Sequence, residues 1–142
     1  MTDTLSSVAA AQEALIDEFA FFDDWMERYQ HLMDLGRKLE PMSPALCTDA
    51  TRVNGCQSQV WLHAVREGDR LHLRATSDST LVTGLIAVLL TVFNQRTPQE
   101  ILDADVGFLA EIGLDEHLSA NRRNGLNAMI ERIRAIARDA LA

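Results

Sequence analysis

The chain has 142 residues, enough for one domain with a hydrophobic core, and its 47% hydrophobic and 24% charged residues are typical of globular proteins. A formal net charge of -8 repels phosphate backbones and argues against binding to nucleic acid. The longest apolar run, 85–90, is too short to cross a bilayer, and the N-terminus shows no export signal. Two cysteines do not make a disulfide scaffold. We therefore expect a single cytoplasmic domain over residues 1–142, without membrane association.

Two amphipathic helices are predicted at the start of the chain. Apolar residues recur at three- and four-residue steps over residues 8–22 and again over residues 25–39. Asp24, with Glu27 three residues later, is typical of the residue that caps a helix N-terminus. Two prolines at positions 41 and 44 end the second helix, because each disfavours helical backbone at the residue before it.

A β-hairpin is predicted in the middle of the chain. Residues 59–67 form its first strand, and residues 71–76 alternate strictly between apolar and polar side chains. Gly68-Asp69 between them is typical of a two-residue hairpin turn. Arg52-Val53 is predicted to add a third strand. The sheet is therefore expected to be small and antiparallel, with about three strands and one face covered by helices.

The second half of the chain is predicted to be helical. Residues 81–93 are apolar on almost every side, which indicates a buried helix, and Gly84 within it suggests close approach to another backbone. Thr97-Pro98-Gln99-Glu100 is a helix start with a capping box. A final helix begins near Ser119 and carries an apolar stripe made of Leu126, Met129, Ile130, Ile133 and Ala137. The predicted fold class is α+β.

Cys56 is the residue most able to carry chemistry. It follows Gly55, which favours a tight bend, and precedes the polar, uncharged side chains of Gln57, Ser58 and Gln59. Backbone N–H groups at such a bend favour a thiolate, the nucleophilic form of cysteine. A buried, structural cysteine remains an alternative, because free cysteine is usually a small hydrophobic residue.

Metal and hydrolase sites are not supported by the residue spacing. Cys47 and Cys56 lie too far apart for a zinc knuckle, and the four histidines are scattered over different elements. His63 lies in the strand after the bend, and nothing in the sequence brings it back to Cys56 as a base. The remaining chemistry needs only the sulfur atom, as in thiol exchange or sulfur transfer, and no cofactor is expected.

The segment 53–61, which reads Val-Asn-Gly-Cys-Gln-Ser-Gln-Val-Trp, resembles the signature of the SufE/CsdE family of cysteine desulfuration proteins. Further matches follow in the family's order over nearly the whole chain. They are Leu35-Gly36, Ser77-Asp78, the run Gly84 to Val88, Thr97-Pro98-Gln99, Arg122, Gly125-Leu126 and Ala128-Met129-Ile130.

The resemblance implies a SufE/IscU-like fold and a sulfur carrier that is not itself an enzyme. Cys56 would accept persulfide sulfur from a pyridoxal-phosphate cysteine desulfurase of the SufS or CsdA type, stimulate that enzyme, and relay the sulfur to iron–sulfur cluster assembly. Pyridoxal phosphate would belong to the partner. Gly55, Gln57 and Ser58 would form the supporting loop. Because a persulfide has to be sheltered from free thiols, we expect this loop to lie against an apolar surface made partly by helix 81–93.

The sequence does not decide the roles of two residues that match family positions and of one residue that departs from the family pattern. Asp78 and Arg122 match positions near that surface, where either would dock the partner or hold the loop; the alternatives are a helix cap for Asp78 and a solvated charge for Arg122. Cys47 lies in a variable loop and is either incidental or a resolving thiol for Cys56.

Rival functions also remain open at this point. A CsdE-type paralogue would serve another sulfur acceptor, a stand-alone thiol enzyme such as a thiol peroxidase would use Cys56 without a partner, and an interaction module would keep Cys56 structural. The sequence decides neither the oligomeric state nor the final sulfur acceptor.

Overall fold

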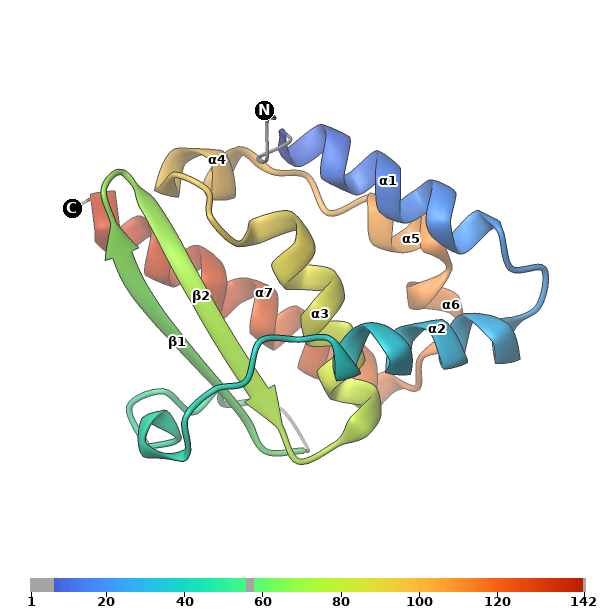
Figure 1. The fold of residues 1–142 in the computed structure, drawn as a ribbon, viewed down its shortest axis with the longest axis horizontal. Coiled ribbons are helices and arrows are strands. Elements are labelled where there is room, and N and C mark those ends of the chain that lie inside the picture. The colour runs from blue at the N-terminus through green and yellow to red at the C-terminus, as the bar shows by residue number, and fades with distance from the viewer. Residues whose placement is uncertain (1–6, 56–57, 142) are drawn as a thin grey trace.

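A β-hairpin and a long C-terminal helix run along one side of the molecule, and the other helices gather around a central apolar helix, as the computed structural model shows (Figure 1). The structure describes residues 7–55 and 58–141, except for the side chain of Asp115. No helix within these residues is long and apolar enough to cross a membrane.

The N-terminal helices form a hairpin, and the predicted cap of the second helix is present. Helix α1 spans Val8–Ala20 and α2 spans Trp25–Arg37. The Asp24 side chain accepts a hydrogen bond from the amide of Glu27 at 2.9 Å and so caps α2. A short 3₁₀ turn, Pro44–Leu46, follows in the proline-containing segment.

The predicted β-hairpin is present, and its register is fixed by the turn. Strands β1 (Val60–Glu67) and β2 (Arg70–Ser77) pair antiparallel, with Glu67 opposite Arg70 across the two-residue turn. The alternation of β2 places one set of side chains inside, where they pack on the helices. The inward residues of β2 are Leu71, Leu73 and Ala75.

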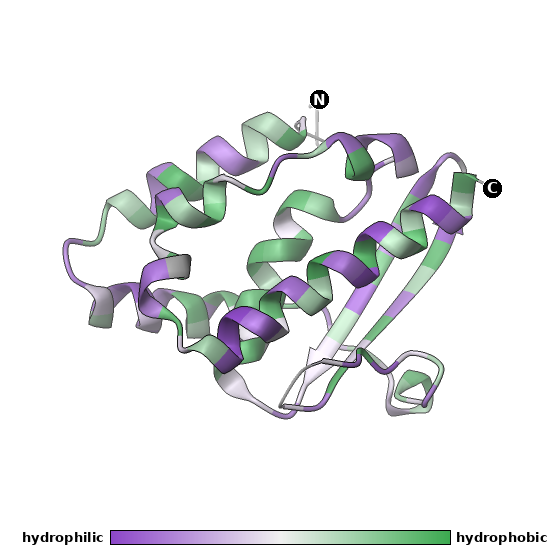
Figure 2. Cartoon of the chain, turned by 180° about the vertical axis from the view of Figure 1, so that it is seen from behind, coloured by the Kyte–Doolittle hydropathy of each residue, from purple (hydrophilic) through white to green (hydrophobic). Residues whose placement is uncertain are grey.

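Helix α3 (Thr80–Phe93) is the centre of the core and is hydrophobic along nearly its whole length (Figure 2). It crosses α2 at the two glycines Gly36 and Gly84. A Cβ atom built on Gly84 would lie 2.4 Å from the carbonyl oxygen of Leu32. The predicted close approach at Gly84 is therefore confirmed, and α2 is the partner helix.

The remaining helices complete the fold. Helix α4 (Pro98–Asp103) begins with the predicted capping box, and two short helices, α5 (Phe108–Ile112) and α6 (Leu114–His117), follow. The last helix, α7 (Ala120–Leu141), alternates polar and apolar colours in Figure 2, as expected of a surface helix. Its buried stripe is the predicted one: Leu126, Met129, Ile130, Ile133 and Ala137.

The α+β class and the antiparallel sheet are confirmed, but the third strand is wrong. Within the described residues the sheet has two strands, and Arg52 contributes only an isolated bridge to Trp61. Turns on both sides explain this: the amide of Thr51 bonds back to the carbonyl of Thr48, and Gly55 bends the chain with φ +91°. One residue pair is left for pairing.

Candidate functional site

The predicted reactive residue, Cys56, lies with Gln57 outside the described residues, but the chain on both sides of them is described. Gly55, directly before Cys56, has φ +91°, a left-handed conformation that favours glycine. A Cβ on Gly55 would also come 3.3 Å from the Cβ of Ala128 on α7. Backbone conformation and the close packing against α7 therefore both favour glycine at this position.

The segment before Gly55 is attached to β1 through its backbone. The amide of Val53 donates to the carbonyl of Val60 at 2.8 Å, and the amide of Leu62 donates to the carbonyl of Thr51 at 2.8 Å. Val53 is buried in the core between the hairpin, α3 and α7. We call residues 50–53 the N-terminal stem of the Cys56 loop.

The segment after Gln57 is attached to the start of α3 by Asp78. The Asp78 carboxylate accepts from the amide of Gln59 at 3.0 Å, and the Asp78 amide donates to the carbonyl of Gln59 at 3.3 Å. The cap of α3 is provided by Ser79, whose hydroxyl accepts from the amide of Val82. The helix-cap alternative for Asp78 is therefore wrong, because the Asp78 carboxylate bonds to Gln59 and its neighbour Ser79 caps the helix.

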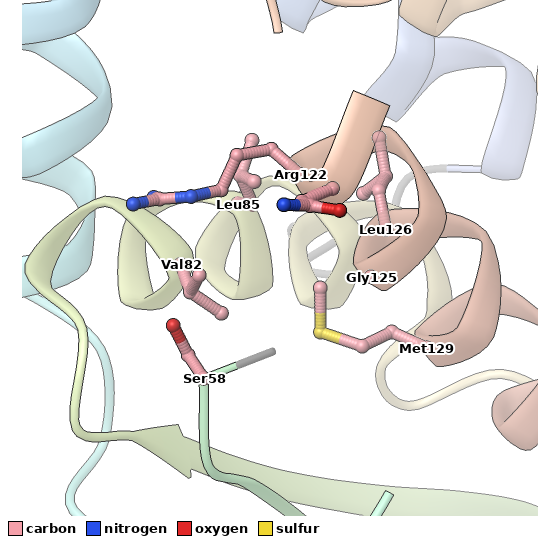
Figure 3. Close-up of a pocket in the computed structure, with 8 residues that line it drawn as sticks. Ser58, Val82, Leu85, Arg122, Gly125, Leu126 and Met129 are labelled. Atoms are coloured by element: carbon pink, nitrogen blue, oxygen red, sulfur yellow. The ribbon is translucent and has the colours of Figure 1, made fainter. Parts of the chain in front are cut away.

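A small pocket opens beside Ser58, between α3 and the first turns of α7 (Figure 3). Its volume is about 20 Å³. A pocket of this size can hold one or two atoms of a bound group and no more. The lining is mostly apolar and comprises Ser58, Val82, Leu85, Asn121, Arg122, Gly125, Leu126 and Met129.

Arg122 brings a positive charge to this pocket. Its backbone amide donates to the hydroxyl of Ser119 at 3.2 Å in the cap of α7, and its side chain runs along α3 in Figure 3. The Nη1 atom is buried and has no hydrogen-bond partner among the described residues. A buried guanidinium N–H without a partner is costly, and an anion placed within reach would satisfy it.

The structure therefore places two of the predicted site residues beside one pocket and bonds a third to a residue next to one of them. Ser58 and Arg122 line one pocket, and Asp78 binds the residue after Ser58. Asn121 and Met129 line the same pocket but were not predicted as site residues, because amide and apolar residues on a helix carry no signal of a site; Met129 was named only as a match to the family.

The second thiol, Cys47, follows the 3₁₀ turn and is half-buried, with its Sγ 3.9 Å from the carbonyl oxygen of Ser43. Whether Cys47 is incidental or a resolving thiol for Cys56 stays open, because Cys56 lies outside the described residues. No group of three or more possible metal ligands lies together within the described part of the chain.

Comparison with known proteins agrees with the resemblance found in the sequence. The family model for the SufE "Fe-S metabolism associated domain" matches residues 13–137. A SufE-like protein of Rhizobium meliloti (strain 1021) is 40% identical over 130 residues, which cover 88% of this chain and 93% of the relative. A SufE-like protein of Rhizobium etli is 37% identical over 134 residues, 91% of this chain and 90% of the relative.

The fold is similar to that of a protein from Thermus thermophilus whose solution structure is known. The two chains superpose with a TM-score of 0.77 at 26% identity, covering 92% of this chain and 96% of the other. Since the family model covers most of the chain and the sequence identity to both relatives is above one third, the chain belongs to the SufE family of proteins associated with iron–sulfur metabolism.

Proposed function

We propose that the protein is a sulfur carrier that accepts sulfane sulfur on Cys56 from a pyridoxal-phosphate cysteine desulfurase of the SufS or CsdA type. The Cys56 thiolate attacks the outer sulfur of the desulfurase persulfide. The sulfur–sulfur bond of the donor breaks, a new one forms on Cys56, and the donor cysteine leaves as a thiolate. Removal of the sulfur stimulates the desulfurase, and the carrier then passes it to an iron–sulfur scaffold in the cytoplasm.

The observation that carries this proposal is the pocket beside Ser58. It is mostly apolar, it has room for a group of atomic size, and it is lined by Arg122, whose buried Nη1 has no partner among the described residues. A persulfide is anionic at its outer sulfur and is attacked by free thiols. An apolar pocket with one cationic donor would stabilise that anion and keep other thiols away.

The constraints on the loop are consistent with a carrier. Gly55 rests on Ala128, and Gln59 is bonded to Asp78, so the residues before and after the Cys56–Gln57 pair are anchored to α7 and to the start of α3. Preorganised flanking segments reduce the entropy lost when a loop enters a partner's active site. The partner supplies the cofactor, so the carrier itself requires no cofactor and acts as an activator and not as an enzyme.

The direct test is stimulation of a SufS- or CsdA-type desulfurase by the carrier. Cys56→Ser should lose stimulation, whereas the matched control Cys47→Ser should keep it. Full stimulation by Cys56→Ser would refute the proposal. Turnover of a peroxide by the protein alone, dependent on Cys56, would favour the stand-alone thiol enzyme instead. A Cys56 that resists alkylation in the folded protein would favour the interaction module.

The same experiment separates the SufE and CsdE pathways when it is run with both kinds of desulfurase. A carrier of the SufE pathway should bind the SufS-type enzyme, and stimulate it, at lower carrier concentration than the CsdA-type enzyme requires. The reverse order would place the chain in the CsdE-type pathway, which serves another sulfur acceptor.

A further inference from the structure

Arg132 on α7 makes two hydrogen bonds to the backbone of the N-terminal stem. Its Nη2 donates to the carbonyl of Ala50 at 2.7 Å, and its Nη1 donates to the carbonyl of Arg52 at 3.1 Å. The two acceptors lie 82 and 80 residues away in the chain. We propose that Arg132 is a positioning residue that holds the N-terminal stem of the Cys56 loop against α7; this role rests on the proposed function of Cys56.

The planar fork of arginine suits this task. Two N–H groups of one guanidinium point to two carbonyls that are two residues apart, which fixes the stem in direction as well as in distance. A lysine in the same place has a single nitrogen, so it cannot hold both carbonyls with the same geometry. The bonds are charge-assisted, which makes them stronger than ordinary amide hydrogen bonds.

The helix that carries Arg132 is a firm support. Met129 and Ile133, on either side of it in sequence, are buried in the core, and Arg66 of β1 donates to the carbonyl of Ala140 at 3.1 Å near the far end of the helix. Ala128, one turn before Arg132, is the residue against which Gly55 packs. Residues i and i+4 share one face of a helix, so Ala128 and Arg132 lie on the same face of α7 and together contact the chain that leads to Cys56.

It follows that different side chains hold the two sides of the Cys56 loop. Arg132 holds the N-terminal stem at Ala50 and Arg52, and Asp78 holds the other side at Gln59. The Val53 amide bonds to the carbonyl of Val60 in β1, and the Leu62 amide of β1 bonds to the carbonyl of Thr51 in the stem, so both bonds depend on the stem staying in place. Loss of Arg132 should therefore loosen these bonds without disturbing the core, and should reduce the fraction of molecules ready for docking.

The test compares Arg132→Met and Arg132→Lys with Arg138→Met, which removes the same charge from an exposed position of the same helix. Amide hydrogen exchange is measured at Val53 and Leu62, with Val88 in α3 as the measure of global stability. In Arg132→Met, protection at Val53 and Leu62 should fall about tenfold, the effect of losing two exposed hydrogen bonds. Arg132→Lys should give a smaller fall, and Arg138→Met no change. Unchanged protection at Val53 and Leu62 in Arg132→Met would overturn the inference.

The second readout is the carrier concentration that half-saturates the desulfurase. Arg132→Met should raise it by a similar factor and leave the turnover at saturation unchanged, because the loop is less often in place but reacts normally once docked. Faster exchange at Val53 and Leu62 together with an unchanged half-saturating concentration would contradict a positioning role. Failure of the wild-type carrier to stimulate the enzyme would refute the proposed function instead, and hydrogen exchange would still decide whether Arg132 holds the stem. Should Arg132→Met fail to fold, Arg132→Lys decides the same points.

Discussion

The contact between α2 and α3 predicts a large effect from the smallest substitution, Gly84→Ala. The added Cβ would lie 2.4 Å from the carbonyl oxygen and 2.8 Å from the carbonyl carbon of Leu32. These are backbone atoms of the facing helix, so no change of side-chain rotamer can relieve the contact. The two helices have to move apart, and Gly36, on the facing side of the same crossing, moves with them.

Two terms of opposite sign give the magnitude. Alanine is better than glycine in a helix interior by about 1 kcal/mol, which favours the variant. Overpacking costs about 1–3 kcal/mol, and a clash with rigid backbone belongs at the upper end, about 3 kcal/mol. We therefore expect Gly84→Ala to lower the free energy of unfolding by about 2 kcal/mol.

The assay is urea denaturation followed by far-UV circular dichroism. The midpoint should fall by about 1 M urea with an unchanged slope. Gly107→Ala is the control, because the backbone of Gly107 is right-handed and its added Cβ would meet only the movable side chain of Asp105. That variant should stay within about 0.5 kcal/mol of the wild type. A Gly84→Ala protein as stable as the wild type would refute the packing argument.

Two further predictions concern side chains that bond to the backbone. Asp78→Ala removes the acceptor of the Gln59 amide, so hydrogen exchange at Gln59 should rise severalfold and the free energy of unfolding should fall by about 1 kcal/mol. Asp78→Asn keeps an acceptor oxygen and should retain most of the protection at Gln59 and most of the stability. Equal exchange at Gln59 in the wild type and both variants would contradict this role. Hydrogen bonds from Thr97 lower the pKa of Glu100, so its contribution to stability is complete above the ordinary glutamate pKa and is lost as the pH falls through the lowered one. The stability advantage of the wild type over Glu100→Gln should therefore shrink on acidification, and an advantage independent of pH would contradict the assignment.

The sequence alone predicted those parts of the fold that depend on near neighbours. The hairpin turn at Gly68-Asp69 and the capping box from Thr97 to Glu100 each need only a few consecutive residues, and both are present. Gly84 signalled a close approach, but not which backbone it would meet. The partner, Leu32, lies in another helix, and no local pattern joins the two.

The candidate site shows the same limit. Ser58 and Asp78 were named from the family resemblance, and the structure adds what each of them contacts. The two bonds of Arg132 join segments about 80 residues apart, so in the sequence Arg132 is only one of several arginines off the apolar stripe of the last helix. The prediction of a third strand was wrong for a related reason. Turns before and after Arg52 leave a single bridge where pairing along a whole strand was predicted.

The central claim, that Cys56 carries sulfur, is tested most directly by intact mass and peptide mapping after incubation with a cysteine desulfurase and cysteine. The account predicts that the wild type and Cys47→Ser each gain the mass of one sulfur atom, located on the peptide that contains Cys56, and that Cys56→Ser gains none. A carrier that gains no sulfur while the desulfurase turns over, or a Cys56→Ser variant that still gains it, would contradict the account.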